Sequence, residues 1–278
     1  MTSRLPSTRS VVLCADDFAL HPGVSRGIAQ LATQGRLSAT SVMVLAPGWP
    51  QDAALLQPLR GRIDVGLHLD WTSHFALQAG HGSSLGKLML QAALGRLDEA
   101  AALAVIDAQL DAFEAVWGAA PDHVDGHQHV QQFAGIRQPL VRALQRRYRR
   151  PGVRMPYLRI SRPLAPLADM KSRVIAAMGA NALEQIAETS GIARAGALLG
   201  IYDFTGNASA YRQLMARWLS LAPTGSLIMC HPAATQQADD VIGAARLREF
   251  EVLGSAEFEA ALSHAGVTLA RGQEGAGR

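Results

Sequence analysis

Acidic residues and histidines cluster at four points of this sequence, and each cluster directly follows a short apolar run. The clusters are Asp16 with Asp17, His68, residues 125–129 (Asp-Gly-His-Gln-His) and His231. Apolar runs of this length, bounded by turn residues, are typical of buried strands. If these strands lie parallel in one sheet, their carboxyl ends meet on one face, where α/β folds build active sites. The pattern therefore predicts an α/β fold with one polar site at that face.

Strand-like and helix-like patterns alternate from Val11 almost to the C-terminus, without a linker or an internal repeat. Such alternation predicts βα units around a parallel sheet. Seven or eight expected strands favour a (β/α) barrel, either complete or an incomplete seven-stranded one, over an open sheet. The expected strands are residues 11–15, 39–45, 63–68, 123–124, 153–155, 198–202, 226–230 and 267–269.

Helices are expected between these strands, at residues 24–34, 103–117, 140–148, 208–219 and 255–264. Residues 103–117 carry an apolar stripe at helical spacing, which indicates a core-facing helix. Ser255 is expected to cap the last helix at its start, and Gly266 to end it. Residues 158–197, interrupted by several glycines, fit no regular unit and predict an insertion or a substrate-binding excursion.

The length and composition fit one domain over residues 1–278, because 278 residues with 49% hydrophobic content can bury a substantial core. We expect the ends, residues 1–9 and 272–278, to be flexible. No window is apolar and long enough for a membrane span, and the first ten residues lack the apolar core of a signal peptide. The expected location is therefore the cytoplasm.

The cysteine content and the charge argue against a disulfide-rich secreted domain and a nucleic-acid-binding protein. Cys14 and Cys230 are too few for a disulfide framework and are expected to be buried, reduced thiols. The formal net charge is +3, and much of the basic excess lies in residues 137–162. Cations suit a helix C-terminus, and no nucleic-acid-binding module surrounds this run. We expect a solvated helix end there and no nucleic-acid partner.

The polar clusters favour a divalent-metal site. Burying two adjacent carboxylates without partners costs free energy, so Asp16 and Asp17 indicate a functional site. They could instead cap the start of a helix. At a strand end the chain turns, so that one carboxylate can bind a metal while its neighbour faces the water. His68 alone is more often a core histidine, and a lone His-x-His pair is common by chance. The recurrence of such residues at four strand ends is what favours a metal site.

Five motifs together resemble the YdjC-like carbohydrate deacetylases, the ChbG/HpnK group. The motifs lie at residues 15–18, 35–41, 66–69, 125–130 and 229–233, in the family's order, and the resemblance spans residues 11–269. It implies a (β/α) barrel enzyme that uses one divalent metal ion to remove acetyl groups from N-acetylated sugars. The predicted substrate is a chito-oligosaccharide or the sugar headgroup of a glycoconjugate or glycolipid.

The resemblance also implies roles for individual residues. It places the metal on Asp17, His68 and His127. Asp16 matches the general base, and His231 matches a site histidine that could act as general acid. His129 matches a second histidine, which we place in the substrate pocket beside the metal. Two imidazoles and one carboxylate suit Zn²⁺, whereas the family has been described with Mg²⁺, so either metal is compatible.

Three further residues bear on the site. Arg154 ends an expected strand, where it either orients Asp16 or a sugar oxygen, or is a surface arginine. Asp125 is a candidate partner behind a metal-binding imidazole. Ala19 stands where the family usually has glycine, which narrows the backbone conformations allowed there. Other polar residues are expected in solvated or loop positions, namely Asp70, His74, His81 and His123.

Two other functions stay open. One is a different metal-dependent amidohydrolase or phosphoesterase on the same barrel, and the other is a non-catalytic sugar-binding barrel that keeps the metal for structure. The sequence is compatible with a homodimer but does not specify one.

Overall fold

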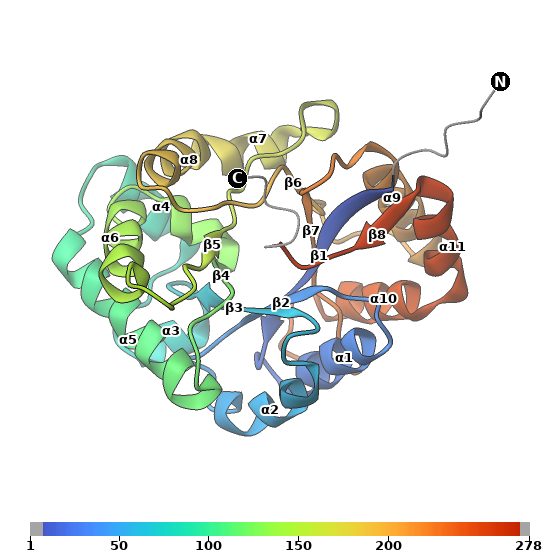
Figure 1. Ribbon diagram of the computed structural model, residues 1–278, viewed down its shortest axis with the longest axis horizontal. Helices are drawn as coiled ribbons and strands as arrows, with labels where there is room; N and C mark the ends of the chain where they lie inside the picture. Colours follow the sequence, from blue (N-terminus) through green and yellow to red (C-terminus); the bar gives the residue numbers. More distant parts are fainter. Residues whose placement is uncertain (1–7, 273–278) are drawn as a thin grey trace.

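A parallel β-sheet forms the centre of the molecule, and helices surround it (Figure 1). The structure is a computed structural model that describes residues 8–272. The strands are β1 (Arg9–Phe18), β2 (Ala39–Val42), β3 (Asp64–Leu69), β4 (His123–Gly126), β5 (Tyr157–Leu158), β6 (Leu198–Leu199), β7 (Leu227–Cys230) and β8 (Val267–Leu269). Seven of them lie in the order β5-β4-β3-β2-β1-β7-β6, and β8 pairs in parallel with the start of β1.

The sheet curls until its two outer strands approach each other. Isolated parallel bridges join Leu158 to Arg194 and Pro163 to Leu198, across the gap between β5 and β6. Both outer strands are only two residues long, so they form no continuous ladder there. The predicted (β/α) barrel is confirmed in its incomplete form.

The helices occupy the connections between strands and pack on the outside of the sheet (Figure 1). They are α1 (Pro22–Thr33), α2 (Trp49–Leu56), α3 (His74–Gln78), α4 (Leu85–Ala93), α5 (Glu99–Trp117), α6 (Arg137–Tyr148), α7 (Met170–Ala177), α8 (Ala180–Thr189), α9 (Ala208–Leu221), α10 (Gly243–Gly254) and α11 (Ala256–Ala265). Short 3₁₀ turns lie at η1 (Gln57–Leu59), η2 (His127–Gln132) and η3 (Ala165–Leu167).

Local sequence signals account for most of these elements. The apolar stripe predicted within residues 103–117 is the buried face of α5, including Ile106, Leu110 and Phe113. Ser255 accepts a hydrogen bond from the backbone N–H of Phe258 at the start of α11, and Gly266 ends that helix in the left-handed conformation. Both caps are as predicted. Cys14 and Cys230 are buried free thiols, also as predicted.

One expected strand is wrong in position. The strand expected at residues 153–155 lies instead at Tyr157–Leu158. Residues 158–197 are the crossover from β5 to β6, which carries α7 and α8. At the chain ends, Arg9 begins β1 and donates to the Ala222 carbonyl at 2.6 Å, and Gly272 N–H donates to Asp64 Oδ2 at 2.7 Å. These contacts hold Arg9 and Gly272 in place, whereas the expectation for residues 1–7 and 273–278 lies outside the described residues.

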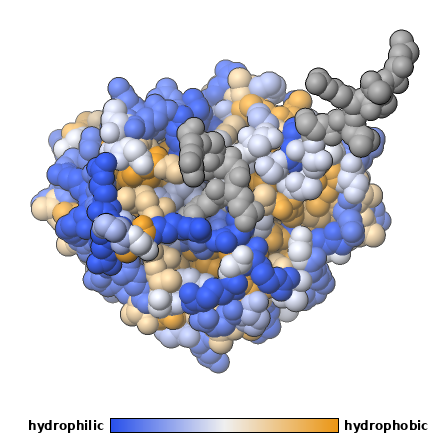
Figure 2. All heavy atoms as spheres, in the orientation of Figure 1, coloured by the Kyte–Doolittle hydropathy of each residue, from blue (hydrophilic) through white to orange (hydrophobic). Residues whose placement is uncertain are grey.

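The basic run of α6 is paired with acidic residues of α5. Arg147 contacts Asp111 and, at 3.1 Å, Glu114, while Arg146 contacts Asp107. These ion pairs place the basic run on the surface of the α5–α6 pair. Hydrophilic side chains cover much of the face shown in Figure 2. Among the described residues, no helix combines the length and the apolar character that crossing a bilayer requires.

Gly66 of β3 provides a test of this packing. A Cβ atom at this position would lie 2.3 Å from the His123 ring, which is itself stacked on Tyr157. Gly66→Ala should therefore lower the free energy of unfolding by about 1–3 kcal/mol through overpacking. In α4, a Cβ at Gly86 meets nothing within 4 Å. Gly86→Ala should raise the same free energy by about 0.5–1 kcal/mol. Urea denaturation of both variants checks this, and equal effects would contradict the packing described.

Candidate active site

The carboxyl end of β1 brings two adjacent carboxylates into one cavity. Asp16 and Asp17 are 2% and 1% exposed, and both line that cavity. In a regular strand they would point to opposite faces. Here the β1–β2 register shifts between Ala15 and Phe18, and Asp17 has a φ of 68°. This local twist turns both side chains toward the same cavity.

The same turn forces Ala19 into an unfavourable conformation. Its φ is 74°, in the left-handed region that a glycine adopts at no steric cost. This is the position where the sequence departs from the usual glycine of the resembled family. The turn that follows Asp16, Asp17 and Phe18 thus forms with alanine at position 19, where the family usually has glycine.

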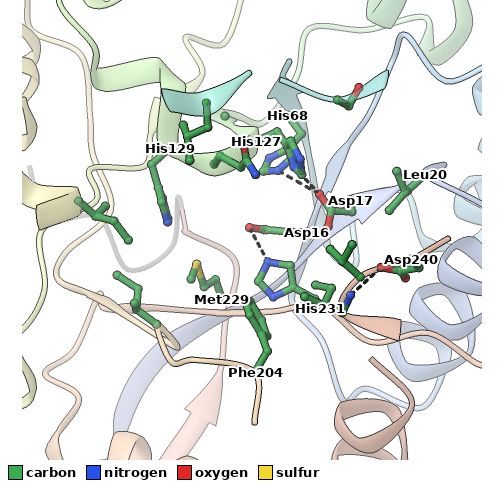
Figure 3. Close-up of a pocket in the computed structure, with 18 of the residues that line it drawn as sticks. Asp16, Asp17, Leu20, His68, His127, His129, Phe204, Met229, His231 and Asp240 are labelled. Carbon is green, nitrogen blue, oxygen red and sulfur yellow. Dashed lines mark hydrogen bonds and ion pairs between the residues drawn. The ribbon is translucent and has the colours of Figure 1, made fainter. Parts of the chain in front are cut away.

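Asp17, His68 and His127 converge at the centre of the cavity (Figure 3). One ligand atom from each lies within 4.8 Å of the others. The nearer ring nitrogens lie 3.0 Å (His127 Nδ1) and 3.4 Å (His68 Nε2) from Asp17 Oδ1. The structure therefore brings together the three residues that the sequence predicted to hold the metal, from β1, β3 and the end of β4.

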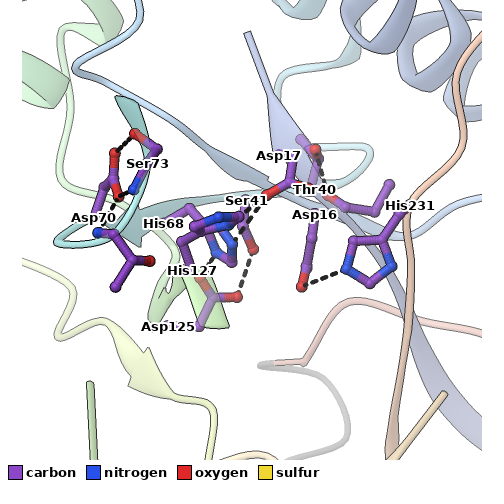
Figure 4. A network of polar contacts seen from close by, with 12 residues as sticks. Asp16, Asp17, Thr40, Ser41, His68, Asp70, Ser73, Asp125, His127 and His231 are labelled. Carbon is purple, nitrogen blue, oxygen red and sulfur yellow. Dashed lines mark hydrogen bonds and ion pairs between the residues drawn. The ribbon is translucent and has the colours of Figure 1, made fainter. Parts of the chain in front are cut away.

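Asp125 lies behind His68 (Figure 4). His68 Nδ1 donates to Asp125 Oδ1 at 2.6 Å, which leaves Nε2 facing Asp17. Asp125 Oδ2 accepts from Ser41 Oγ at 2.5 Å. Burial lowers the pKa of His68, but the Asp125 carboxylate outweighs burial and raises this pKa to about 10. Such a carboxylate behind an imidazole orients the ring as metal-binding histidines require.

Arg246 of α10 restrains the other oxygen of Asp17. It is buried, and its Nη2 donates to Asp17 Oδ2 at 2.7 Å while its Nε donates to Asp240 Oδ2 at 2.8 Å. Burial raises the pKa of Asp17, but Arg246 and His127 together hold it well below its usual range. Asp17 is therefore ionised, with only Oδ1 directed at the two histidines. Nothing in the sequence pointed to Arg246, because α10 was not among the expected helices.

Asp16 is held by Arg159. The guanidinium donates from Nη1 to Asp16 Oδ1 at 2.7 Å and from Nη2 to Oδ2 at 2.9 Å. Arg159 Nη1 also lies 3.1 Å from Asp125 Oδ2. One buried guanidinium thus pairs with two carboxylates of the site.

The structure does not bring Arg154 to the site. Its side chain is 62% exposed, and its Nη1 lies 3.9 Å from Asp122. The strand was expected at residues 153–155, so that it began four residues before β5. The arginine that follows the real strand is Arg159, which makes the contact with Asp16 once suggested for Arg154.

His231 and His129 lie on opposite sides of the carboxylates (Figure 3). His231 Nε2 is 3.9 Å from Asp16 Oδ2, and the backbone N–H of His231 donates to Glu249 at 2.6 Å. His129 Nδ1 lies 2.9 Å from Ser161 Oγ instead of facing the Asp17 group. Burial lowers the pKa of both histidines. Both rings line the cavity in an uncharged form at neutral pH.

The His-x-His pair lies on a turn and not on a strand. Residues 127–132 form the turn η2, in which Gln128 and His129 have left-handed φ values of 54° and 64°. The two rings therefore diverge, one toward Asp17 and one toward Ser161. An alternating strand would have placed them side by side.

Two residues expected in solvated positions are buried. Asp70 accepts from the backbone N–H of Ser73 at 2.9 Å. His123 lies in β4 with Nε2 3.0 Å from Ser41 Oγ. A ligand atom of His123 also lies within 4.8 Å of Cys14 and Asp125, so this trio is a second candidate metal group. Burial raises the pKa of Cys14 well above its usual value, which disfavours the thiolate that a metal needs.

Comparisons with known proteins identify the family. The profile of the family described as YdjC-like protein matches residues 10–264. The chain belongs to the YdjC-like family. A carbohydrate deacetylase of Mus musculus is 29% identical over 292 residues, which cover 93% of this chain and 92% of that protein. A chitooligosaccharide deacetylase of Klebsiella pneumoniae (strain 342) is 29% identical over 270 residues, which cover 94% of this chain and 97% of that protein.

A solved structure of another protein has a similar fold. It is described as a putative cellobiose-phosphate cleavage protein from Enterococcus faecalis V583. The two superpose with a TM-score of 0.71 at 21% sequence identity, covering 98% of this chain and all of the other. The similarity supports the incomplete barrel as the fold of this chain.

The metal group can be tested with His127, the most accessible of its three residues. His127→Ala should weaken Zn²⁺ binding by more than the about 10–100-fold that removing an outer partner costs. His129→Ala is the matched control, because His129 faces Ser161, and it should bind Zn²⁺ like the wild type. Isothermal titration calorimetry measures both, and equal losses would show that the ligands are assigned wrongly.

The two arginines provide a second test. Arg159→Met leaves two buried carboxylates without their cation and should lower the free energy of unfolding by about 3–5 kcal/mol. Arg154→Met removes an exposed side chain, and its effect should stay within about 0.5 kcal/mol. Denaturant unfolding of Arg159→Met and Arg154→Met measures both free energies of unfolding. A larger effect at Arg154 than at Arg159 would contradict the assignment of Arg159 as the buried partner of the carboxylates.

Proposed function

We propose that this protein is a metal-dependent hydrolase that removes the acetyl group from an N-acetylated sugar. The observation that carries the proposal is the arrangement of Asp16 beside the Asp17, His68 and His127 group in one cavity. The names of the two relatives, both deacetylases, support amide hydrolysis over phosphoester hydrolysis. The proposed substrate is a chito-oligosaccharide or the sugar of a glycoconjugate. We place the reaction in the cytoplasm and the activity in a single catalytic domain.

The donor set fits a divalent cation. It offers one carboxylate oxygen and two imidazole nitrogens, and it leaves open space on the cavity side for water and substrate. Asp17 is ionised, and the hydrogen bond from His68 to Asp125 directs the other ring nitrogen toward it. When bound, a divalent cation activates water and polarises a carbonyl oxygen. Zn²⁺ and Mg²⁺ are both candidates.

Asp16 is the proposed general base. Its carboxylate lines the cavity, and Arg159 holds both oxygens, so the group is fixed in position before the substrate binds. In this position it would accept a proton from the attacking water. Because Asp16 and Asp17 are adjacent, the base lies next to the point where the water is held.

His231 is the proposed general acid. The departing amine leaves poorly as an anion, so it needs a proton. Burial lowers the pKa of His231, so the ring rests uncharged and must receive its proton during turnover. Asp16 Oδ2 lies 3.9 Å from His231 Nε2, so this carboxylate could pass on the proton taken from water. The pair would thus connect the base and acid steps.

The roles of the two aspartates can be separated by substitution. Asp16→Asn keeps the size of the side chain, and it should abolish acetate release from N,N′-diacetylchitobiose while leaving bound metal unchanged. Asp17→Ala should lose both the metal and the activity. Acetate assays, paired with metal analysis of each purified variant, measure the two effects. Metal loss in both variants would refute Asp16 as the base, and full activity in Asp16→Asn would refute the mechanism.

A non-catalytic sugar-binding barrel makes a different prediction. The wild-type protein would then retain metal and release no acetate from any acetamido sugar in a broad panel.

A further inference from the structure

His231 differs from His68 and His129 in how its ring is held. His68 Nδ1 donates to Asp125 Oδ1 at 2.6 Å, and His129 Nδ1 lies 2.9 Å from Ser161 Oγ. His231 Nδ1 is also buried, but none of the described residues makes a hydrogen bond to it. A hydrogen bond to the second ring nitrogen is the usual means of orienting a functional histidine. The orientation of the His231 ring therefore depends on other contacts.

A buried carboxylate holds the backbone of His231. Glu249 of α10 is 0% exposed, and its Oε2 accepts the backbone N–H of His231 at 2.6 Å. Its Oε1 accepts the hydroxyl of Tyr202 at 2.6 Å, so both oxygens of the carboxylate are fixed. Hydrogen bonds to a charged acceptor are stronger than those between neutral groups. Glu249 thus fixes the backbone from which the His231 ring projects, directly after the end of β7.

Phe204 restricts the ring itself. Its own ring packs edge-on against His231, with the centroids 5.2 Å apart and the planes at 84°. Figure 3 shows His231 beside Asp16, with Phe204 on its other side. The carbonyl of Phe204 accepts from Arg248 Nη2 of α10 at 2.8 Å, which holds this part of the chain in place. With the backbone fixed and Phe204 packed against it, the ring presents Nε2 to Asp16 Oδ2 at 3.9 Å.

One face of α10 contacts two separate parts of the site. Arg246 and Glu249 are three residues apart, so their side chains lie on the same face of the helix. Arg246 donates to Asp17, and Glu249 accepts from His231. Both side chains are buried, and burying a charged group costs free energy unless it is paired. The helix thus fixes the position of the proposed acid relative to a proposed metal ligand.

We propose that Glu249 is a positioning residue for His231, and that it holds the backbone of the general acid so that Nε2 points at the departing amine. The inference rests on the proposed function, in which Nε2 gives its proton to the amine nitrogen as that nitrogen takes the electron pair of the breaking C–N bond. Without Glu249, the backbone N–H of His231 loses its acceptor. A displacement of about 1 Å can lower the rate by about 100-fold.

Two substitutions separate the hydrogen bond of Glu249 from its charge. Glu249→Met removes the acceptor, and kcat for acetate release from N,N′-diacetylchitobiose should fall by at least about tenfold, with KM and bound Zn²⁺ unchanged. Glu249→Gln keeps an oxygen for the N–H of His231, while its NH₂ group faces the Tyr202 hydroxyl, which can also accept. This variant should keep most of the wild-type kcat. Equal losses in both variants would assign the effect to the charge and overturn the inference.

The leaving group distinguishes a displaced acid from general damage to the site. 4-Nitrophenyl acetate releases a stabilised phenolate that needs no proton, whereas a sugar amine needs one. In Glu249→Met, kcat/KM should therefore fall by at least about tenfold more for N,N′-diacetylchitobiose than for the ester. His231→Ala should show the same pattern, and ester hydrolysis that persists in Asp17→Ala is subtracted as unspecific. Equal falls for the two substrates in Glu249→Met would show general damage and contradict a positioning role.

Gln109→Met is the matched control. Gln109 of α5 is also 0% exposed, and its Oε1 accepts the backbone N–H of Asp70, which directly follows β3, at 2.9 Å. The variant removes the same kind of contact, from a buried helix side chain to a strand end, but not at His231. It should keep the wild-type ratio of the two kcat/KM values, and a fall as large as in Glu249→Met would overturn the inference. If Glu249→Met does not fold, Glu249→Asp replaces it, because the shorter side chain withdraws its carboxylate from His231.

NMR spectroscopy separates the positioning role from the proposed function. In protein with labelled histidine and phenylalanine, it measures the nuclear Overhauser contact between the rings of His231 and Phe204, and the exchange rate of the His231 amide proton. We expect Glu249→Met to lose the ring contact and to exchange faster, and Glu249→Gln and Gln109→Met to keep both wild-type properties. This result supports the positioning role even if no sugar releases acetate and the proposed function fails. A ring contact that survives in both Glu249→Met and Glu249→Asp would overturn the inference and leave the deacetylase function intact.

Discussion

Burial of three carboxylates against two arginines is the interaction on which the rest of the site depends. Asp16, Asp17 and Asp125 are all shielded from water, and unpaired charges in that position would cost several kcal/mol each. Arg159 pairs with both Asp16 and Asp125, and Arg246 pairs with one oxygen of Asp17. The arginines come from the end of β5 and from α10, so the charges hold distant parts of the chain together.

This pairing also gives the two adjacent aspartates different surroundings. Arg159 takes both oxygens of Asp16, whereas Arg246 takes one oxygen of Asp17 and leaves the other facing two imidazoles. A single turn, with left-handed residues at Asp17 and Ala19, allows both side chains to reach one cavity. The difference in partners supports the different roles that we propose for these two identical side chains.

The sequence predicted those site residues that directly follow a clear apolar strand. It did not predict their buried partners, which follow short or indistinct elements. Asp16, Asp17, His68 and His127 follow clear apolar runs, so their convergence could be predicted. Arg159 follows a strand of only two residues, and that strand was expected four residues too early. Arg246 lies on a helix without a distinct apolar stripe. His123 was expected at a solvated position, but it is buried and its Nε2 contacts Ser41 Oγ. Pairing between distant residues has no local pattern in the sequence.

The central claim is that Asp17, His68 and His127 hold one divalent cation beside Asp16. X-ray absorption spectroscopy of the Zn²⁺-loaded protein tests it most directly, because it identifies the ligand atoms without reference to turnover. The account predicts a shell of nitrogen and oxygen at about 2.0–2.1 Å with the multiple scattering of two imidazoles. A sulfur ligand at about 2.3 Å would place the metal at Cys14 and His123 instead, and would contradict the account.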